Sequence, residues 1–289
     1  MKKTGHLLLV PVAAVVVILL FVQNTRNSAE NSLEKRIEKI QRANSQPEIS
    51  CSELAAAHPL VLLALGQSNA GNHGHLESRS PTVNIIADQR CVLAHDPLPG
   101  ATGEGGSIWS HLAPLLTAPL GTSPVVLSVL AVDSTTIAEW TDRSGPLKSI
   151  LTAKLASMNQ LGLPPTLILW QQGEADARDY TSEEDYMAHL QELASILDDE
   201  GVHAPIILAK STVCRSSRYD KLHTAIEKTV AQFPRFQRGP DTDALDGDQI
   251  RDGCHLRQAG LKSAARMWAA SVSRALKTLG SPPLSPLKP

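Results

Sequence analysis

Four short apolar runs lie in the middle of the chain, and each is continuous rather than alternating. They are 60–66 (LVLLALG), 125–132 (VVLSVLAV), 166–173 (TLILWQQG) and 204–211 (APIILAKS). Strands that are buried on both faces, as in a parallel sheet, have this pattern. We therefore predict four buried strands.

The segments around these runs have helical periodicity. They include 108–116, 146–162 and 186–201, and a long closing segment covers 259–280. Strands that alternate with helices favour a mainly parallel sheet with helices on both faces. We predict this α/β architecture for residues 51–280.

The N-terminus carries a different pattern. Lys2 and Lys3 precede an unbroken apolar run from Leu7 to Val22. Its length lies between that of a signal-peptide core and that of a spanning helix. We interpret residues 1–28 as a cytoplasmic start plus an uncleaved signal anchor, a transmembrane helix; a cleaved signal peptide is the alternative. Both place the rest of the protein outside the cytoplasm.

Two polar segments flank the predicted domain. Residues 29–50 are charged, with Leu33, Ile37 and Ile40 in a narrow helical stripe, and are predicted to form a short stalk or a weak coiled coil. Residues 281–289 form a proline-rich tail that we expect to be irregular. The sequence does not indicate the oligomeric state.

The net charge limits the classes of partner that we expect the protein to bind. The 289 residues carry a formal net charge of −2. A nucleic-acid partner would favour a basic face, so we expect no nucleic-acid binding.

Polar side chains follow each predicted strand. Ser68 stands in a glycine-rich turn after the first strand, Asp133 follows the second and Glu174 the third, while Asp252 and His255 precede the closing helix. The carboxyl ends of parallel strands meet at one edge, where ligands bind. A serine, a histidine and a carboxylate at one edge are the components of acyl transfer.

Four motifs strengthen this interpretation. In chain order they are GQSN (66–69), GEGGSIW (103–109), WQQGEAD (170–176) and DGCHL (252–256). This order resembles the SGNH hydrolases, specifically the sialate O-acetylesterase-like group that includes carbohydrate esterase family 6. The resemblance covers roughly residues 58–276. It implies a flavodoxin-like three-layer fold and a serine esterase that needs no metal or cofactor.

The resemblance also assigns roles residue by residue. It makes Ser68 the nucleophile, His255 the general base and Asp252 its partner. The oxyanion donors would be the Ser68 N–H, Gly105 or Gly106, and the Gln172 amide. Residues expected to contact the substrate or to support these groups are Gln67, Asn69, Glu174 and Asp133. The chain departs from the family at Asp133-Ser134, where two glycines are usual.

The cysteines fit an exported domain. The chain has four, none in C-x-x-C spacing, so we expect no zinc site. Cys214 follows a predicted strand and Cys254 adjoins His255, so both should reach the same sheet edge and form a disulfide. Cys51 and Cys91 are a second candidate pair, and free thiols are the alternative.

These observations favour a membrane-anchored, extracytoplasmic carbohydrate O-acetylesterase that acts on an acetylated glycan. One alternative is a lipid or thioester hydrolase on the same fold. A second is a catalytically silent carbohydrate-binding or scaffold protein. The sequence does not indicate which glycan carries the acetyl group.

Overall fold

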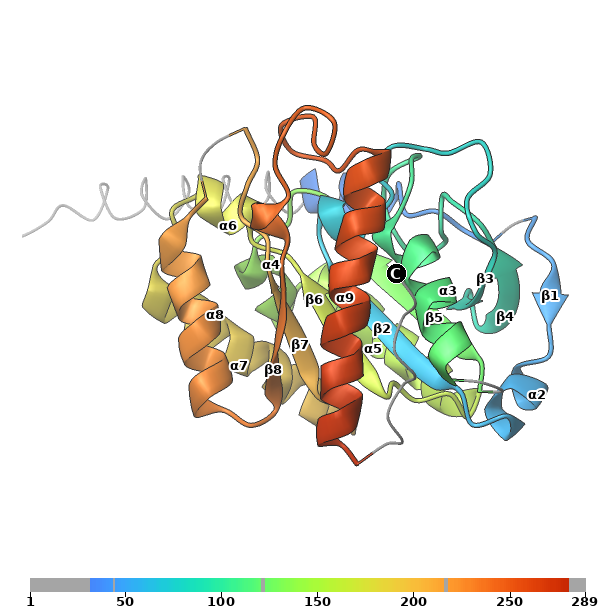
Figure 1. Cartoon of the computed structure of the whole chain (residues 1–289). Coiled ribbons are helices and arrows are strands. Elements are labelled where there is room, and N and C mark those ends of the chain that lie inside the picture. The colour runs from blue at the N-terminus through green and yellow to red at the C-terminus, as the bar shows by residue number, and fades with distance from the viewer. Residues whose placement is uncertain (1–31, 44, 121–122, 216–217, 281–289) are drawn as a thin grey trace, which may run out of the picture.

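A single mixed sheet forms the centre of the molecule. The computed structural model describes residues 32–43, 45–120, 123–215 and 218–280. Within these ranges the strands are ordered β1-β4-β3-β5-β2-β6-β7-β8 (Figure 1). Their bounds are β1 Glu48–Ile49, β2 Leu60–Gly66, β3 Val83–Ala87, β4 Arg90–Ala94, β5 Val125–Ala131, β6 Leu167–Gln171, β7 Ile206–Lys210 and β8 Phe236–Asp241. The six strands from β3 to β8 in this order are parallel, and β4 and β1 are antiparallel to their neighbours.

Helices cover both faces of the sheet. The bounds are α2 Cys51–Ala56, α3 Ile108–Leu120, α4 Ile137–Thr141, α5 Pro146–Gln160, α6 Glu174–Arg178, α7 Glu183–Asp199, α8 Asp220–Gln232 and α9 Gln258–Thr278. Figure 1 views the molecule from the face that α3 and α9 cover. The other face packs against α5, α7 and α8.

The central strand β2 explains why its sequence is apolar throughout. Leu62 and Ala64 pack into the core beneath α3 and α9, whereas Leu63 and Leu65 pack into the core beneath α5, α7 and α8. All seven residues of β2 are buried. Fully burying a leucine side chain stabilises the fold by about 1.5–3 kcal/mol. The predicted α/β architecture with a mainly parallel sheet is confirmed.

The structure also contains strands that the sequence analysis did not predict. β3 and β4 form a hairpin whose turn residues, Asp88 and Gln89, have positive φ. β8 contains Gly239 and Pro240, residues that normally weaken a strand. It pairs only with β7 at the edge of the sheet, where a missing N–H is tolerated.

The predicted stalk needs correction where the structure describes it. Residues 32–37 are helical, and Leu33 and Ala43 are buried at 4% and 0% exposure. β1 adds to the sheet beside β4. This segment therefore packs on the domain instead of standing apart from it, because its apolar stripe finds partners in the core.

The predicted membrane anchor, residues 1–28, and the tail lie outside the described residues. Within the part of the chain that the structure describes, no helix is long and apolar enough to cross a membrane.

Two disulfides join the four cysteines. Cys214 bonds to Cys254 and Cys51 bonds to Cys91, each pair separated by 40 positions in the sequence. Both predicted pairings are confirmed.

Candidate active site

The turn that carries the predicted nucleophile, Ser68, directly follows β2, and we call it the nucleophile turn. Gly66 has φ +148°, and a Cβ there would lie 2.0 Å from the Gln171 carbonyl oxygen, so the turn requires glycine. Ser68 then opens a 3₁₀ turn, η1 (Ser68–Ala70), and is 8% exposed. Within the described residues its main-chain N–H donates to no acceptor. An N–H at the start of a helical turn has no partner within that turn.

His255 reaches the same place from a loop before α9. The loop is held by Arg251, which is 5% exposed and donates to the carbonyls of Thr242, Val213, Leu245 and Cys254. Sequence analysis missed Arg251, because nothing in its spacing distinguishes it from a surface arginine. Its four bonds fix the position of the residue next to His255.

Asp252 lies at the start of this turn. Its carboxylate accepts the main-chain N–H of His255 at 2.9 Å, and its own N–H donates to the His255 carbonyl at 3.0 Å. Among the described groups, no hydrogen bond joins this carboxylate to the imidazole. Burial alone would raise the pKa of Asp252, but the N–H and the charge of His255 hold it below its usual value.

One cavity brings Ser68 and His255 together. Its volume is about 680 Å³. It is lined by Gln67, Ser68, His73, Asp133, Ser134, Glu174, Ala175, Ala177, Arg178, Tyr180, Cys214, Arg215, Tyr219, Cys254 and His255. The cavity opens at the carboxyl edge of the parallel strands, as predicted for an α/β sheet. Of the residues proposed from sequence, Gln67, Asp133 and Glu174 also line it.

The electrostatic surroundings of His255 favour its neutral form. Burial lowers the pKa of His255, and Arg251 and Arg215 lower it further, against the opposing effects of Asp252 and Asp133. A neutral imidazole can accept a proton, as a general base must.

A second histidine stands beside His255, and the sequence analysis did not single it out. The rings of His73 and His255 are 5.2 Å apart between centroids. His73 Nε2 lies 3.1 Å from Thr102 Oγ1, which accepts the N–H of Asp133 at 3.0 Å. His73 follows the GQSN motif by four positions, and nothing in that spacing identifies it.

Asn69 and Glu174 connect the nucleophile turn to the loop that carries His255. Asn69 Nδ2 donates to Glu174 Oε1 at 2.6 Å and to the Cys254 carbonyl at 3.0 Å. Ser211 Oγ donates to the same Glu174 oxygen at 2.7 Å, and Glu174 Oε2 is buried without a partner among the described groups. Burial raises the pKa of Glu174 to about 7. Asn69 therefore links the segments that carry Ser68 and His255.

Two of the predicted oxyanion donors already donate hydrogen bonds to main-chain carbonyls. The N–H groups of Gly105 and Gly106 donate to the carbonyls of Asn72 and Gly74 at 2.7 and 2.9 Å, in an antiparallel bridge. These glycines allow the close approach of two loops: a Cβ on Gly105 would lie 2.1 Å from the Gly74 oxygen. Their expected role as donors does not fit these bonds.

Gln172 also differs from expectation. It is completely buried, and its Nε2 donates to the Thr135 carbonyl at 2.9 Å and to Asp176. Its Oε1 accepts the Tyr186 hydroxyl at 3.0 Å. An amide NH₂ has two hydrogens, and both are used beneath the cavity. The predicted contact between Gln172 and an oxyanion is therefore not supported.

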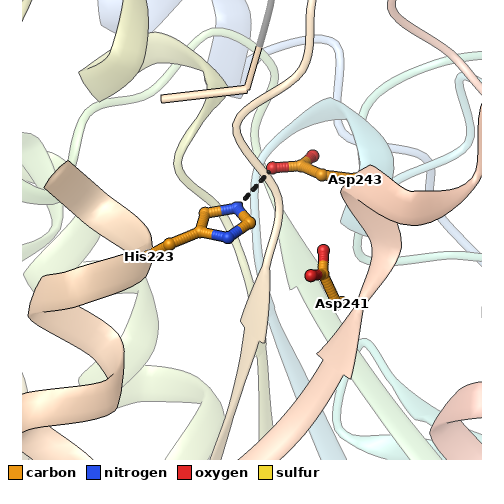
Figure 2. Close-up of side chains that lie close together, drawn as sticks. All are labelled: His223, Asp241 and Asp243. Carbon is orange, nitrogen blue, oxygen red and sulfur yellow. Dashed lines mark hydrogen bonds and ion pairs between the residues drawn. The ribbon is translucent and has the colours of Figure 1, made fainter. Parts of the chain in front are cut away.

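A cluster outside the cavity has the composition of a metal site. His223, Asp241 and Asp243 each place a ligand atom within 4.8 Å of the others (Figure 2). The Asp243 carboxylate already accepts bonds from His223 Nε2, Thr212 Oγ1 and the N–H groups of Thr212 and Val213. Burial would raise its pKa, but these bonds hold it below its usual value. The cluster anchors the segment that precedes Cys214.

Comparisons with known proteins agree with the fold. A protein from Arabidopsis thaliana is 18% identical with a TM-score of 0.61, over 76% of this chain and 98% of that one. A carbohydrate acetylesterase from Xanthomonas citri is 14% identical with a TM-score of 0.51, over 75% of this chain and 56% of that one. Identities this low show likeness of fold alone. No curated protein sequence matches the chain.

The family comparison covers most of the sequence. The family described as "Carbohydrate esterase, sialic acid-specific acetylesterase" matches residues 59–274. This range contains all four motifs and every residue that lines the cavity. The chain therefore belongs to the family of sialic acid-specific acetylesterases, carbohydrate esterases that hydrolyse carboxylic esters.

Proposed function

We propose that the protein is a serine esterase that removes O-acetyl groups from a carbohydrate through an acyl-enzyme intermediate. The observation that carries this proposal is that Ser68 and His255 line one cavity, although distant parts of the chain supply them. The burial of Ser68 and the neutral state favoured for His255 support the assignment of nucleophile and base.

The first half of the reaction transfers the acetyl group to Ser68. His255 takes the hydroxyl proton of Ser68 as Oγ attacks the acetyl carbonyl carbon. The C–O bond to the sugar then breaks, and the imidazolium returns the proton to the departing sugar oxygen. In the second half, water attacks the acyl-enzyme with His255 again acting as base, which releases acetate and restores Ser68.

Asp252 supports this cycle electrostatically. Its charge raises the pKa of His255 and so stabilises the imidazolium that forms in each half-reaction. Its bond to the His255 N–H also fixes the turn that carries the ring.

The Ser68 N–H is our proposed donor to the oxyanion. It lacks an acceptor among the described residues, and it belongs to the residue whose Oγ attacks. Gln172 would act indirectly, by holding Thr135 and Asp176 beneath the cavity. Removing one oxyanion donor costs about 3 kcal/mol of barrier, so the identity of the donors matters for rate.

The character of the cavity favours a sugar ester over a lipid ester. Charged or hydrogen-bonding residues form most of its lining, and only two alanines and the disulfide cysteines are small apolar groups. These charged or polar side chains can hydrogen-bond to the hydroxyls of a sugar, which a lipid acyl chain lacks. The retained serine, histidine and aspartate favour turnover over a silent binding role.

We further propose an extracytoplasmic location. Two disulfides are typical of an oxidising compartment. The apolar run Leu7–Val22 would direct export, as a signal anchor or as a cleaved signal peptide.

The direct test is acetate release from acetylated oligosaccharides and from a small aryl acetate. We expect wild-type protein to release acetate from both, and Ser68→Ala to lose at least a thousandfold in kcat, because a nucleophile is removed. Circular dichroism checks that the variant is folded. Activity of a folded Ser68→Ala variant above about a tenth of wild type would contradict the assignment.

A further inference from the structure

Two tyrosines and an arginine lie on the lining of the cavity and are not among the reacting groups. They are Tyr180, which follows α6, and Arg215 and Tyr219, which lie between β7 and α8. The reaction proposed above uses none of them.

Tyr180 is placed unusually for a large aromatic residue. It is 78% exposed, and its φ is +57°. A left-handed backbone is unfavourable for a non-glycine residue, and an exposed side chain gains no burial that would offset this cost. The preceding α6 nevertheless fixes this conformation, because Thr181 bonds to Asp176 through its N–H and its hydroxyl, both at 2.9 Å.

The two tyrosines form a pair at the cavity. Their rings are 6.1 Å apart between centroids and are inclined at 83°. Tyr219 is partly buried, and its N–H donates to Thr212 Oγ1 at 2.9 Å. The main chain of Tyr219 is held and the Tyr180 ring is exposed. This edge-to-face pair therefore presents an aromatic surface that can contact an apolar ring face.

Arg215 adds an unpaired charge. Of its neighbours, Arg178 pairs with Asp179 at 2.8 Å and Arg218 pairs with Asp220 at 2.7 Å. Among the residues that the structure describes, no carboxylate pairs with the Arg215 guanidinium.

The main chain of Arg215 is also held in a strained conformation. Its φ is +57°, its N–H donates to the Gly253 carbonyl at 2.8 Å, and it directly follows the disulfide-bonded Cys214. Of the non-glycine residues with positive φ in the described chain, Ser134, Tyr180 and Arg215 all line this one cavity. Strain of this kind concentrates at functional sites.

We propose that Tyr180, Tyr219 and Arg215 form a subsite for an acidic sugar unit that adjoins the acetylated unit. The aromatic pair would contact the apolar face of the pyranose ring, and Arg215 would bind its carboxylate through paired N–H donors. The preferred substrate is then an acetylated oligosaccharide that carries a carboxylate, and this inference rests on the proposed function.

Binding to a catalytically disabled protein tests the subsite directly. Titration calorimetry with full-length Ser68→Ala protein would compare two acetylated oligosaccharides of equal length, a neutral xylo-oligosaccharide and an oligogalacturonate. We expect the acidic ligand to bind about tenfold more tightly, and Arg215→Gln in this background to remove that preference. Arg218→Gln is the matched control, because Arg218 is already paired and does not line the cavity. Equal affinity for both ligands, or an equal effect of both substitutions, would overturn the proposal.

Steady-state kinetics test the aromatic part. We expect Tyr180→Ala to raise KM for the acidic oligosaccharide about fivefold to tenfold more than it raises KM for aryl acetate. Tyr180→Phe keeps the aromatic ring, so we expect it to retain the wild-type ratio of the two KM values. An equal loss on both substrates would contradict a subsite, since it would indicate damage to the reacting groups. Failure of the wild-type protein to hydrolyse aryl acetate would instead refute the proposed function, and the binding measurement would still report on the subsite.

Discussion

Single ionisable groups determine how the protein should respond to pH. His255 must be neutral to accept the Ser68 proton, and burial holds its pKa below the ordinary imidazole value. We therefore expect kcat/KM to fall at low pH with an apparent pKa below about 6.5. The measurement is the pH profile of aryl acetate hydrolysis. An acid limb centred above that value would mean that the charges of Asp252 and Asp133 outweigh burial.

Glu174 makes a separate prediction about stability. Its pKa is raised from 4.5 to about 7, so the folded state binds a proton that the unfolded state has lost between those values. The contribution of Glu174 to the free energy of unfolding is fully present below about pH 4.5 and is lost as the pH rises through about 7. Glu174→Gln keeps an oxygen acceptor for Asn69 and Ser211 but cannot ionise.

The comparison is urea unfolding of wild type and Glu174→Gln at pH 5 and pH 8. We expect the wild type to lose on the order of 2 kcal/mol more than the variant over this interval. Parallel pH dependence of the two proteins would show that Glu174 ionises in the folded state as easily as in the unfolded chain.

At the scale of elements, the two disulfides offer a matched experiment. Each closes a loop between cysteines 40 positions apart, so the chain-entropy model assigns both a similar stabilisation of roughly 4 kcal/mol. Only Cys214–Cys254 borders the cavity. Replacing both cysteines of either pair by serine should cost similar stability, but only the 214/254 variant should lose turnover, by about tenfold or more.

Differential scanning calorimetry and aryl acetate kinetics report the two effects separately. If the 51/91 variant lost as much kcat as the 214/254 variant under conditions where both are folded, the positioning role of the second disulfide would be wrong.

The N-terminal segment 32–43 also supports the cavity wall. Arg36 donates to the Asp133 carbonyl and to Glu139, both at 2.7 Å, and Glu139 belongs to the capping box that starts α4. We expect Arg36→Ala to lower kcat/KM several-fold and to destabilise the protein by about 1–3 kcal/mol, because it leaves these acceptors unpaired. The control is Arg42→Ala, since Arg42 is 70% exposed and lies 3.6 Å from Asp88. Equal effects of the two substitutions would contradict a supporting role for this segment.

At the scale of the whole molecule, the sequence predicted the central elements best. β2 coincides with the predicted run 60–66, because a strand buried on both faces is apolar throughout. β8 was not predicted, since its Gly239 and Pro240 are tolerated only by its edge position, which the sequence does not reveal.

The candidate site likewise contains residues that the sequence predicted and residues that it did not. The cavity positions of Ser68 and His255 followed from strand ends and motifs. The engagement of Gln172 and of Gly105 depends on partners that tertiary packing supplies. Arg251, His73 and Tyr180 were missed because their significance lies in contacts, exposure and backbone angle.

Labelling with a fluorophosphonate tests the central claim, that Ser68 is an activated nucleophile in this cavity, most directly. Such a probe reacts only with an activated serine, and peptide mapping by mass spectrometry locates the adduct. We predict one adduct, on Ser68, that is absent from Ser68→Ala and strongly reduced in His255→Ala, because the base activates the hydroxyl. A folded wild-type protein that takes up no label, or an adduct that persists in Ser68→Ala, would contradict the claim.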